Sequence, residues 1–254
     1  MKGNINVKRI CMVCLLDVLM LGCGFGKNFF SSASHDKLES HTGMNRSIEE
    51  QEERAYAELL ASLRLLQESL NYKLEVPNDF DLEELVDEII AMNQYEEVSS
   101  VNFSKNIQIA LNYDRETLNN LKSIIKDLSH DNHKFALELM NNLSVFGDNL
   151  INALDRIDSD NFLSMLKESQ DVLGLISIKV ILDDMLEKGQ EMVSLLQGII
   201  NNSVLFSDEN EIKKSLELID AFQCASSRVC VLCTEFRIMS FKFVDSVYSL
   251  DKRH

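Results

Sequence analysis

The chain has 254 residues, and its 41 Asp and Glu outnumber its 25 Lys and Arg, which gives a formal net charge of −16 at pH 7. A surface this acidic repels nucleic acids and anionic lipid headgroups, so we expect a basic protein rather than a nucleic acid as partner. Hydrophobic residues make up 45% of the chain and can form a core, whereas only nine glycines and one proline are present. So few turn formers argue against an all-β protein and favour long helices joined by short polar links.

The first 23 residues are predicted to direct export. Three basic residues near the start precede an almost wholly apolar stretch at 10–21, and Gly22 then stands before Cys23. An apolar stretch this short, between a basic start and a small-residue site, is typical of a secretion signal rather than a membrane span. Asp17 interrupts the stretch at a cost of about 3 kcal/mol for a charge at a helix centre, which the surrounding Leu, Val and Met must offset.

The end of this segment, Met20-Leu21-Gly22-Cys23, resembles the bacterial lipoprotein signal, in which Leu, a small residue and Gly or Ala precede a lipidated cysteine. The resemblance implies that residues 1–22 are removed and that Cys23 carries acyl chains, palmitate among them, which fix the protein to a bilayer. No acidic residue follows directly, a pattern that permits sorting to the outer membrane in many bacteria. An ordinary cleaved signal or an uncleaved amphiphilic N-terminus is the alternative, and either would leave Cys23 as a thiol.

The chain after the anchor divides into a tether and a body. Residues 24–46 mix Gly, Ser, His and charged residues without a helical period, which is typical of a flexible tether. The remaining length is enough for one large domain or two small ones, and the continuous helical pattern favours one. We therefore predict a signal peptide at 1–22, a lipidated cysteine with its tether at 23–46, and a single α-helical domain at 47–254 that forms an elongated multi-helix bundle.

Apolar residues recur at spacings of three and four along most of this domain, which predicts amphipathic helices. One helix should begin after a capping box opened by Ser47 and be broken by Pro77, and another should be capped by Asp114. The expected apolar stripes of the first half are Tyr56, Leu59, Leu63, Leu66 and Leu70; Leu82, Leu85, Val86, Ile89 and Ile90; Leu118, Leu121, Ile125 and Leu128; and Phe135, Leu139, Leu143, Phe146, Leu150, Leu154 and Ile157.

Two long helices are predicted at the C-terminal end, and the first spans Asp160 to Asn201. Its apolar stripe changes phase, so we expect its buried face to rotate or the helix to bend. The stripe begins as Phe162, Leu166, Ser169, Leu173, Ile176 and Val180 and resumes as Leu182, Met185, Gly189, Met192, Leu196 and Ile199.

The second long helix is predicted to span Asp208 to Tyr248. Its apolar spacing continues without interruption through Ile219, Phe222, Ser226, Val229, Cys233, Phe236, Ser240, Phe243, Val247 and Leu250. Such sustained spacing is typical of a helix packed along its length, in a bundle or against a second copy. Either this helix lies at the centre of the bundle, or part of it forms a homodimer interface.

Three cysteines remain in the domain once the signal and the lipidation candidate are set aside, namely Cys224, Cys230 and Cys233. An odd number in an exported protein leaves at least one thiol free or paired between molecules. Cys230-Val-Leu-Cys233 has the spacing of a redox pair, but such pairs normally stand at a helix N-terminus. Because this pair is predicted in the middle of a helix, we interpret these cysteines as buried core thiols. A disulfide between helices or chains, and redox or metal chemistry, are the alternatives.

The other motifs indicate no chemistry. His130 and His133 stand at a helix start and could ligate a metal, but no third imidazole or cysteine is close in sequence. The sequence contains no phosphate-cradling glycine loop, serine elbow or paired zinc histidines. Leu-Asn-Tyr occurs at 70–72 and again at 111–113, which we interpret as a chance recurrence. We therefore predict a non-enzymatic protein without catalytic residues, cofactor or metal.

A lipidation signal, a short polar tether and an Asn-rich helical body together resemble the helical surface lipoproteins of Borrelia-type spirochaetes. Among these, the complement-regulator-acquiring proteins are helical bundles whose long C-terminal helix can pair two subunits, and the helix from Asp208 to Tyr248 looks like that element. The resemblance implies an outer-membrane surface antigen that binds a host complement regulator or matrix component in virulence, but it supplies no binding residue. The alternative is a periplasm-facing scaffold lipoprotein of the cell envelope.

Overall fold

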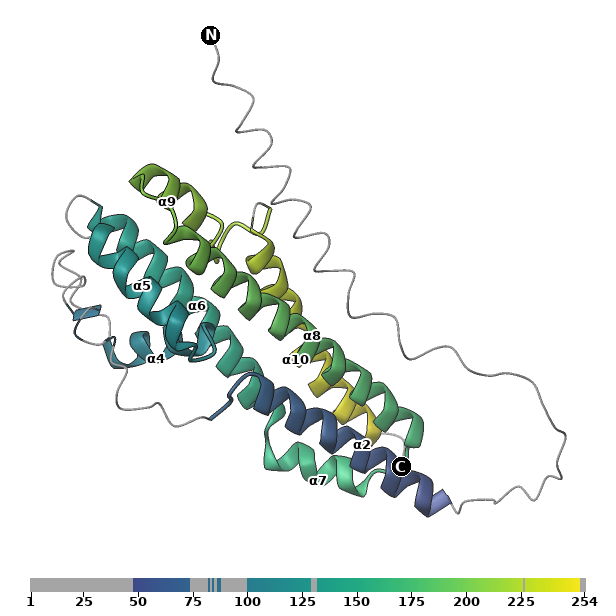
Figure 1. The fold of residues 1–254 in the computed structure, drawn as a ribbon. Coiled ribbons are helices and arrows are strands. Elements are labelled where there is room, and N and C mark those ends of the chain that lie inside the picture. The colour runs from purple at the N-terminus through teal and green to yellow at the C-terminus, as the bar shows by residue number, and fades with distance from the viewer. Residues whose placement is uncertain are drawn as a thin grey trace, which may run out of the picture. The chain divides into compact units, whose positions relative to one another are not determined.

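The structure, a computed structural model, describes residues 48–73, 82, 84, 86, 87, 100–128, 132–225 and 227–251, all within the unit Arg46–His254 (Figure 1). In these residues the chain forms eight α-helices and no strand, which confirms the predicted all-α, multi-helix fold. The predicted signal peptide and tether, with Cys23, lie outside the described residues, and so do Ser47 and Pro77.

The eight helices that the structure describes differ widely in length, and α8 is the longest. In chain order they are α2 (Ile48–Ser69), α4 (Ser100–Ala110), α5 (Arg115–Leu128), α6 (His133–Ile157), α7 (Asp160–Glu168), α8 (Val172–Ser203), α9 (Glu209–Leu216) and α10 (Arg228–Asp251).

Helices α8 and α10 contact most of the other helices. α8 lies beside α2, α5, α9 and α10, while α10 also lies beside α6 and α7, and α4 packs on α6. The largest completely buried side chains are Phe146 of α6 and Phe236 and Phe243 of α10. Burying one such side chain contributes about 1.5–3 kcal/mol relative to leaving it exposed. The body is therefore held together mainly where α10 meets α6 and α8.

Two glycines mark close approaches between helices. A Cβ at Gly174, near the start of α8, would meet the side chain of Leu250 near the end of α10, so these two helices run antiparallel. A Cβ at Gly147 of α6 would overlap the backbone carbonyl of Asn106 in α4. Only glycine leaves room for α4 to cross α6 at this distance.

The predicted single helix from Asp160 to Asn201 is wrong, because the chain forms two helices there, α7 and α8. Ser169 is extended, with φ −73° and ψ 130°, and ends α7. Asp171 then caps α8 by accepting a 2.9 Å hydrogen bond from the backbone N–H of Gly174. A side chain that bonds the nearby backbone offers the chain an alternative to a continuous helix.

This restart of the helix explains the predicted change of phase. Leu173, Ile176 and Val180, expected in the buried stripe, are 75%, 44% and 52% exposed. The buried face of α8 instead includes Leu175, Ile178, Leu182, Met185, Gly189, Met192, Leu196 and Ile200. The second half of the predicted stripe, from Leu182 to Leu196, is thus confirmed, and the first half is wrong where α8 begins.

The predicted helix from Asp208 to Tyr248 is also wrong, since a loop at 217–227 separates α9 from α10. In this loop Asp220 forms an Asx turn, in which its carboxylate accepts hydrogen bonds of 2.7 and 3.0 Å from backbone N–H groups two and three residues later. Ser227 then accepts a 3.2 Å bond from the first turn of α10. Beyond the loop the prediction is confirmed, because the stripe from Val229 to Leu250 is buried.

Most predictions for the other described helices are confirmed. Asp114 caps α5 by accepting a 2.8 Å bond from the third backbone N–H after it. The stripes of α2, α5 and α6 are buried, except that Tyr56 and Phe135 are half-buried. Of the remaining predicted stripe, Leu82 and Val86 are buried, while Leu85, Ile89 and Ile90 lie outside the described residues. Among the residues that the structure describes, no helix is long and apolar enough to cross a bilayer.

Candidate functional site

Helix α2 ends at Ser69 through a Schellman motif, rather than at Pro77 as predicted. The N–H of Tyr72 donates to the carbonyl of Gln67 at 2.9 Å, and Asn71 takes a left-handed φ of 48°. Asparagine is, after glycine, a residue that readily adopts this backbone conformation at a helix end. The helix is therefore closed by its own local sequence, before the proline is reached.

Helix α4 ends in the same way at the second Leu-Asn-Tyr segment. The N–H of Tyr113 donates to the carbonyl of Gln108 at 2.8 Å, and Asn112 has a φ of 53°. In both segments a glutamine stands five residues before the tyrosine, so the sequence match extends to Gln, Leu, Asn and Tyr. The signal in the sequence for a shared helix end is the repeated asparagine, because asparagine adopts the left-handed φ that the motif requires, whereas the carbonyl that closes the motif belongs to the backbone.

The two asparagines also bond to each other. Asn71 Nδ2 donates to the backbone and side-chain oxygens of Asn112 at 3.2 and 2.9 Å, and Asn112 Nδ2 donates to the Ser69 carbonyl at 3.2 Å. We call this pairing the asparagine clasp. The recurrence that looks like chance in the sequence thus has a structural role, since it joins the end of α2 to the end of α4.

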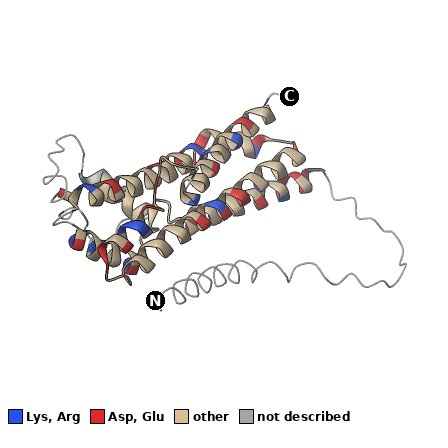
Figure 2. Cartoon of the chain, turned by 90° about the horizontal axis from the view of Figure 1, so that it is seen from above, with Lys and Arg blue, Asp and Glu red and all other residues tan. Residues whose placement is uncertain are grey.

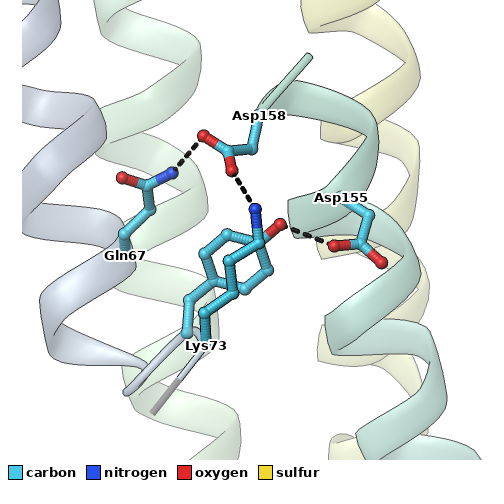
Figure 3. A network of polar contacts seen from close by, with 5 residues as sticks. Gln67, Lys73, Asp155 and Asp158 are labelled. Atoms are coloured by element: carbon cyan, nitrogen blue, oxygen red, sulfur yellow. Dashed lines mark hydrogen bonds and ion pairs between the residues drawn. The ribbon is translucent and has the colours of Figure 1, made fainter. Parts of the chain in front are cut away.

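A polar network connects the end of α2 to the end of α6 (Figure 3). Asp158 accepts a hydrogen bond from Lys73 Nζ at 2.6 Å on one carboxylate oxygen and from Gln67 Nε2 at 2.8 Å on the other. The Tyr72 hydroxyl donates to Asp155 at 2.5 Å. We call these five residues the α2–α6 network, and in it both carboxylates have partners from α2 or the turn that follows.

The electrostatics of the α2–α6 network indicate a structural role. Burial, and then the hydrogen bond to Asp155, raise the pKa of the Tyr72 phenol above its ordinary value of 10.0. The hydrogen bond to Asp158 raises the pKa of the exposed Lys73 ammonium. Both groups keep their protons at neutral pH, so neither can act as a base there. The network lines a hollow of about 550 Å³, but its charged groups are already paired with one another.

The cysteines are arranged differently from the prediction. Cys224 and Cys230 form a disulfide with their Cα atoms 4.8 Å apart, while Cys233 is a free, buried thiol. The interpretation as core thiols is confirmed for Cys233 and wrong for Cys230, because the loop at 217–227 returns Cys224 to the first turn of α10, where it pairs with Cys230. Burial raises the pKa of the Cys233 thiol from 9.0 to about 11, so it is protonated at neutral pH and a poor nucleophile.

A cavity of about 570 Å³ lies between the first half of α6 and the loop at 217–227, and we call it the α6–loop cavity. Asn142 of α6 joins its two sides, since its Oδ1 accepts a 3.3 Å hydrogen bond from the backbone N–H of Ala221. The apolar part of its lining consists of Phe135, Leu139, Leu216, Leu218 and Ile219. No spacing in the sequence predicts this cavity, because Asn142 and Ala221 are 79 residues apart.

The charged lining of the α6–loop cavity is mostly acidic. Three carboxylates, those of Glu138, Glu217 and Asp220, line it together with one ammonium, that of Lys214. Asp220 is used in the turn of its own loop. Glu138 and Glu217 have no ion-pair or hydrogen-bond partner among the described residues. The cavity therefore combines apolar walls with an excess of negative charge, which is suited to binding a cationic and partly apolar group.

The residues considered for a metal site are not brought together in the described part of the chain. His133 is the first residue of α6, and His130 lies outside the described residues. No group of three His, Cys, Asp or Glu side chains that could hold a metal ion occurs among the residues that the structure describes. The α6–loop cavity is thus the arrangement with the clearest capacity to bind a ligand.

The part of the chain that the structure describes is thus an all-α bundle with an acidic, partly apolar cavity beside a disulfide-closed loop. In comparisons with known proteins, no protein-family model, no curated protein and no solved structure matches the chain.

Proposed function

We propose that the protein is a surface-exposed lipoprotein of a bacterial outer membrane, anchored by acyl chains on Cys23, whose helical domain binds a host protein and has no enzymatic activity. The partner is a complement regulator or a matrix component, as in the spirochaetal lipoproteins that the sequence resembles. The role is immune evasion or adhesion. The leader that ends in Gly22-Cys23 is the observation that carries this proposal.

The disulfide in the body supports export independently of the leader. Disulfides such as Cys224–Cys230 persist in oxidising compartments and are rare in the reducing cytosol. The pairing also reduces the odd number of cysteines in the body to one protonated thiol, Cys233. A protein with this set of cysteines is suited to an environment outside the cytosol.

The lining of the α6–loop cavity supports the binding of a partner. Its polar lining consists of carboxylates, amides and one ammonium, set beside apolar walls. Such groups recognise a complementary surface by charge, hydrogen bonding and burial. We therefore place partner binding, rather than turnover of a substrate, at this end of the domain.

Lipid labelling of growing cells tests the anchor directly. Cells that produce the full chain should incorporate labelled palmitate into it, and Cys23→Ala should abolish both the label and recovery in the membrane fraction. Cys233→Ala is the matched control, because it removes a different thiol and should leave the label unchanged. Equal labelling of the wild type and Cys23→Ala would remove the anchor from the proposal.

Protease treatment of intact cells separates the surface lipoprotein from the alternative, a periplasm-facing scaffold of the cell envelope. A surface protein is digested, whereas a periplasmic one survives until the outer membrane is opened. Pull-down from host serum with the detergent-solubilised full chain then tests the host partner. Recovery of a complement regulator or matrix component supports the proposal, and recovery of neither from a correctly anchored protein contradicts its host-binding part.

A homodimer is a separate proposal, and it now concerns α10 rather than a helix from Asp208 to Tyr248. Ile238, Phe241 and Tyr248 lie on one side of α10 and are each about half exposed. A second copy could cover these side chains. Light scattering of the wild type and of Phe241→Ser tests this, since a dimer through α10 should dissociate more readily in the variant.

A further inference from the structure

We infer that the α6–loop cavity docks a segment of a partner protein in which a basic residue stands next to a large apolar one. This inference rests on the proposed function and names its binding site and the chemistry of its partner. Two features of the cavity carry it, namely its apolar walls and its charge.

The apolar walls can take up a side chain of the partner. Leu139, Leu216 and Ile219 line the cavity and are themselves at most 2% exposed, so they form a firm surface. Leu218 also lines the cavity but is 52% exposed, and Phe222 of the same loop is 68% exposed. A cavity of about 570 Å³ falls in the usual range for ligand pockets. An apolar side chain placed against these walls leaves water, which favours binding.

The charge of the cavity selects a cationic neighbour for that side chain. Glu138 and Glu217 line the cavity without a partner among the described residues, and Lys214 alone opposes the three carboxylates. A guanidinium or ammonium group of the partner can bond these carboxylates with charge-assisted hydrogen bonds, which are stronger than neutral ones. An anionic group would meet an excess of like charge. The cavity is therefore selective for basic segments.

Asn142 links the two sides of the cavity. It lines the cavity, is only 7% exposed and uses its Oδ1 to accept the hydrogen bond from the backbone N–H of Ala221 in the loop. The position of the loop relative to α6 is thereby held by a buried side chain.

The loop side of the cavity is fixed before the partner arrives. Cys224 directly follows Gln223, which lines the cavity, and is bonded to Cys230 in α10. Ser227 donates a 2.9 Å hydrogen bond to the carbonyl of Leu218 and so holds the other end of the loop. A wall that is already ordered loses little conformational entropy on binding. The cavity is therefore preorganised for its ligand.

The experiment must distinguish docking in the cavity from general attraction to an acidic protein, because Asp and Glu are spread along the helices of the body (Figure 2). The probe is a fluorescent synthetic peptide with Leu next to Arg, measured by anisotropy against the full chain in detergent. Two matched peptides carry Gln for Arg or Ser for Leu. Both should bind at least about tenfold more weakly, because each lacks one of the two features that the cavity recognises.

Paired variants of the protein locate the binding. Glu138→Gln with Glu217→Gln should weaken binding of the Leu-Arg peptide about tenfold, whereas Glu49→Gln with Glu53→Gln, the same change of charge on exposed α2 positions, should change it less than about twofold. Leu218→Ser should weaken binding as well, unlike Leu205→Ser, which alters a 77% exposed side chain outside the cavity lining. Equal effects of the cavity and control pairs would overturn the inference.

Hydrogen exchange adds a readout that does not depend on a substitution. The bound peptide should protect backbone N–H groups at 133–142 and 217–223, and protection confined to other regions would also overturn the inference.

Failure of the inference can be distinguished from failure of the proposed function. If serum pull-down recovers a host protein equally with the wild type and with the Glu138→Gln, Glu217→Gln variant, the cavity is not the site although host binding stands. If Cys23 is not lipidated, the proposed lipid anchor is wrong, but the result of the peptide experiment is unaffected.

Discussion

The α2–α6 network and the α6–loop cavity are two polar regions on the same helix, and they differ in how their charges are used. In the network, Asp155 and Asp158 accept hydrogen bonds from side chains of the α2 end. In the cavity, Glu138 and Glu217 have no partner among the described residues. A paired carboxylate holds the fold, whereas an unpaired one in a cavity is available to a ligand. The end of α6 is therefore structural, and its beginning is suited to recognition.

The largest effect is expected where a covalent bond maintains the cavity wall. Replacing both Cys224 and Cys230 by Ser should lower the free energy of unfolding by about 2–3 kcal/mol, because the unfolded chain is no longer cross-linked. Urea unfolding measures this loss. Hydrogen exchange should accelerate in the loop at 217–227 and remain slow at the end of α2. Cys233→Ala, which keeps the disulfide, should not accelerate exchange in the loop, and an unchanged loop in the double variant would contradict its covalent support.

Disrupting the asparagine clasp should cause the second-largest loss of stability. Two substitutions of Asn71 separate the contribution of its backbone conformation from that of its hydrogen bonds. Asn71→Ala should cost about 2 kcal/mol, since alanine is strained at a φ of 48° and the bonds to Asn112 are lost. Asn71→Gly removes the same bonds without the strain, so its cost should be about 1 kcal/mol. Chemical unfolding measures both, with Asn119→Ala on the exposed face of α5 as control. Equal losses from the two Asn71 variants would show that its backbone conformation is unimportant.

A smaller effect, with a distinct pH dependence, is expected from the α2–α6 network. Tyr72→Phe should cost about 0.5–1 kcal/mol at pH 7 through loss of the bond to Asp155. The phenol of the folded protein holds its proton at pH values where the unfolded chain, with a pKa of 10.0, releases it. Its contribution is therefore full below pH 10 and declines as the pH rises further. The difference in unfolding midpoint between the wild type and Tyr72→Phe should be smaller at pH 10.5 than at pH 8. An equal difference at both pH values would refute this linkage.

The smallest effect on stability should come from the carboxylates of the cavity. Glu138→Gln with Glu217→Gln should change the free energy of unfolding by less than about 0.5 kcal/mol, because no ion pair is broken. Thermal unfolding measures this. The same two substitutions should strongly weaken peptide binding. At this site we therefore expect a change in binding affinity without a matching change in the free energy of unfolding. A large loss of stability would mean that these side chains belong to the fold, and the contrast between the two ends of α6 would disappear.

The sequence predicts the helices well where burial alone decides, and poorly where a few polar residues end a helix. The stripe from Val229 to Leu250 is buried as expected because its spacing is unbroken within one helix. The stripe through Leu173 fails because Ser169 and Asp171 interrupt the chain without a glycine or proline to mark the break. Such residues are also common on the surface of continuous helices, so their capping role is not visible in the pattern.

The candidate site was harder to predict, because its parts meet only in three dimensions. The spacing of Cys230 and Cys233 suggests a pair, yet Cys230 is bonded to Cys224 six residues before it. That choice depends on where the loop ends and α10 begins. The cavity joins α6 to the α9–α10 loop through Asn142 and Ala221, and no periodicity relates such distant segments. Tertiary contacts of this kind leave no signal in a single sequence.

The burial of Cys233 has a consequence for how the chain reaches its final covalent state. Thiol–disulfide exchange requires a thiolate, and a thiol with a pKa of about 11 is almost wholly protonated at neutral pH. Of the two sulfurs in the disulfide, that of Cys230 lies in a residue only 3% exposed, whereas Cys224 is exposed. A chain that folds before it is oxidised is therefore directed to one connectivity, and the third cysteine is withdrawn from the exchange by the packing of α10. When folding precedes oxidation, the buried Cys233 thiol cannot compete with Cys224 for Cys230.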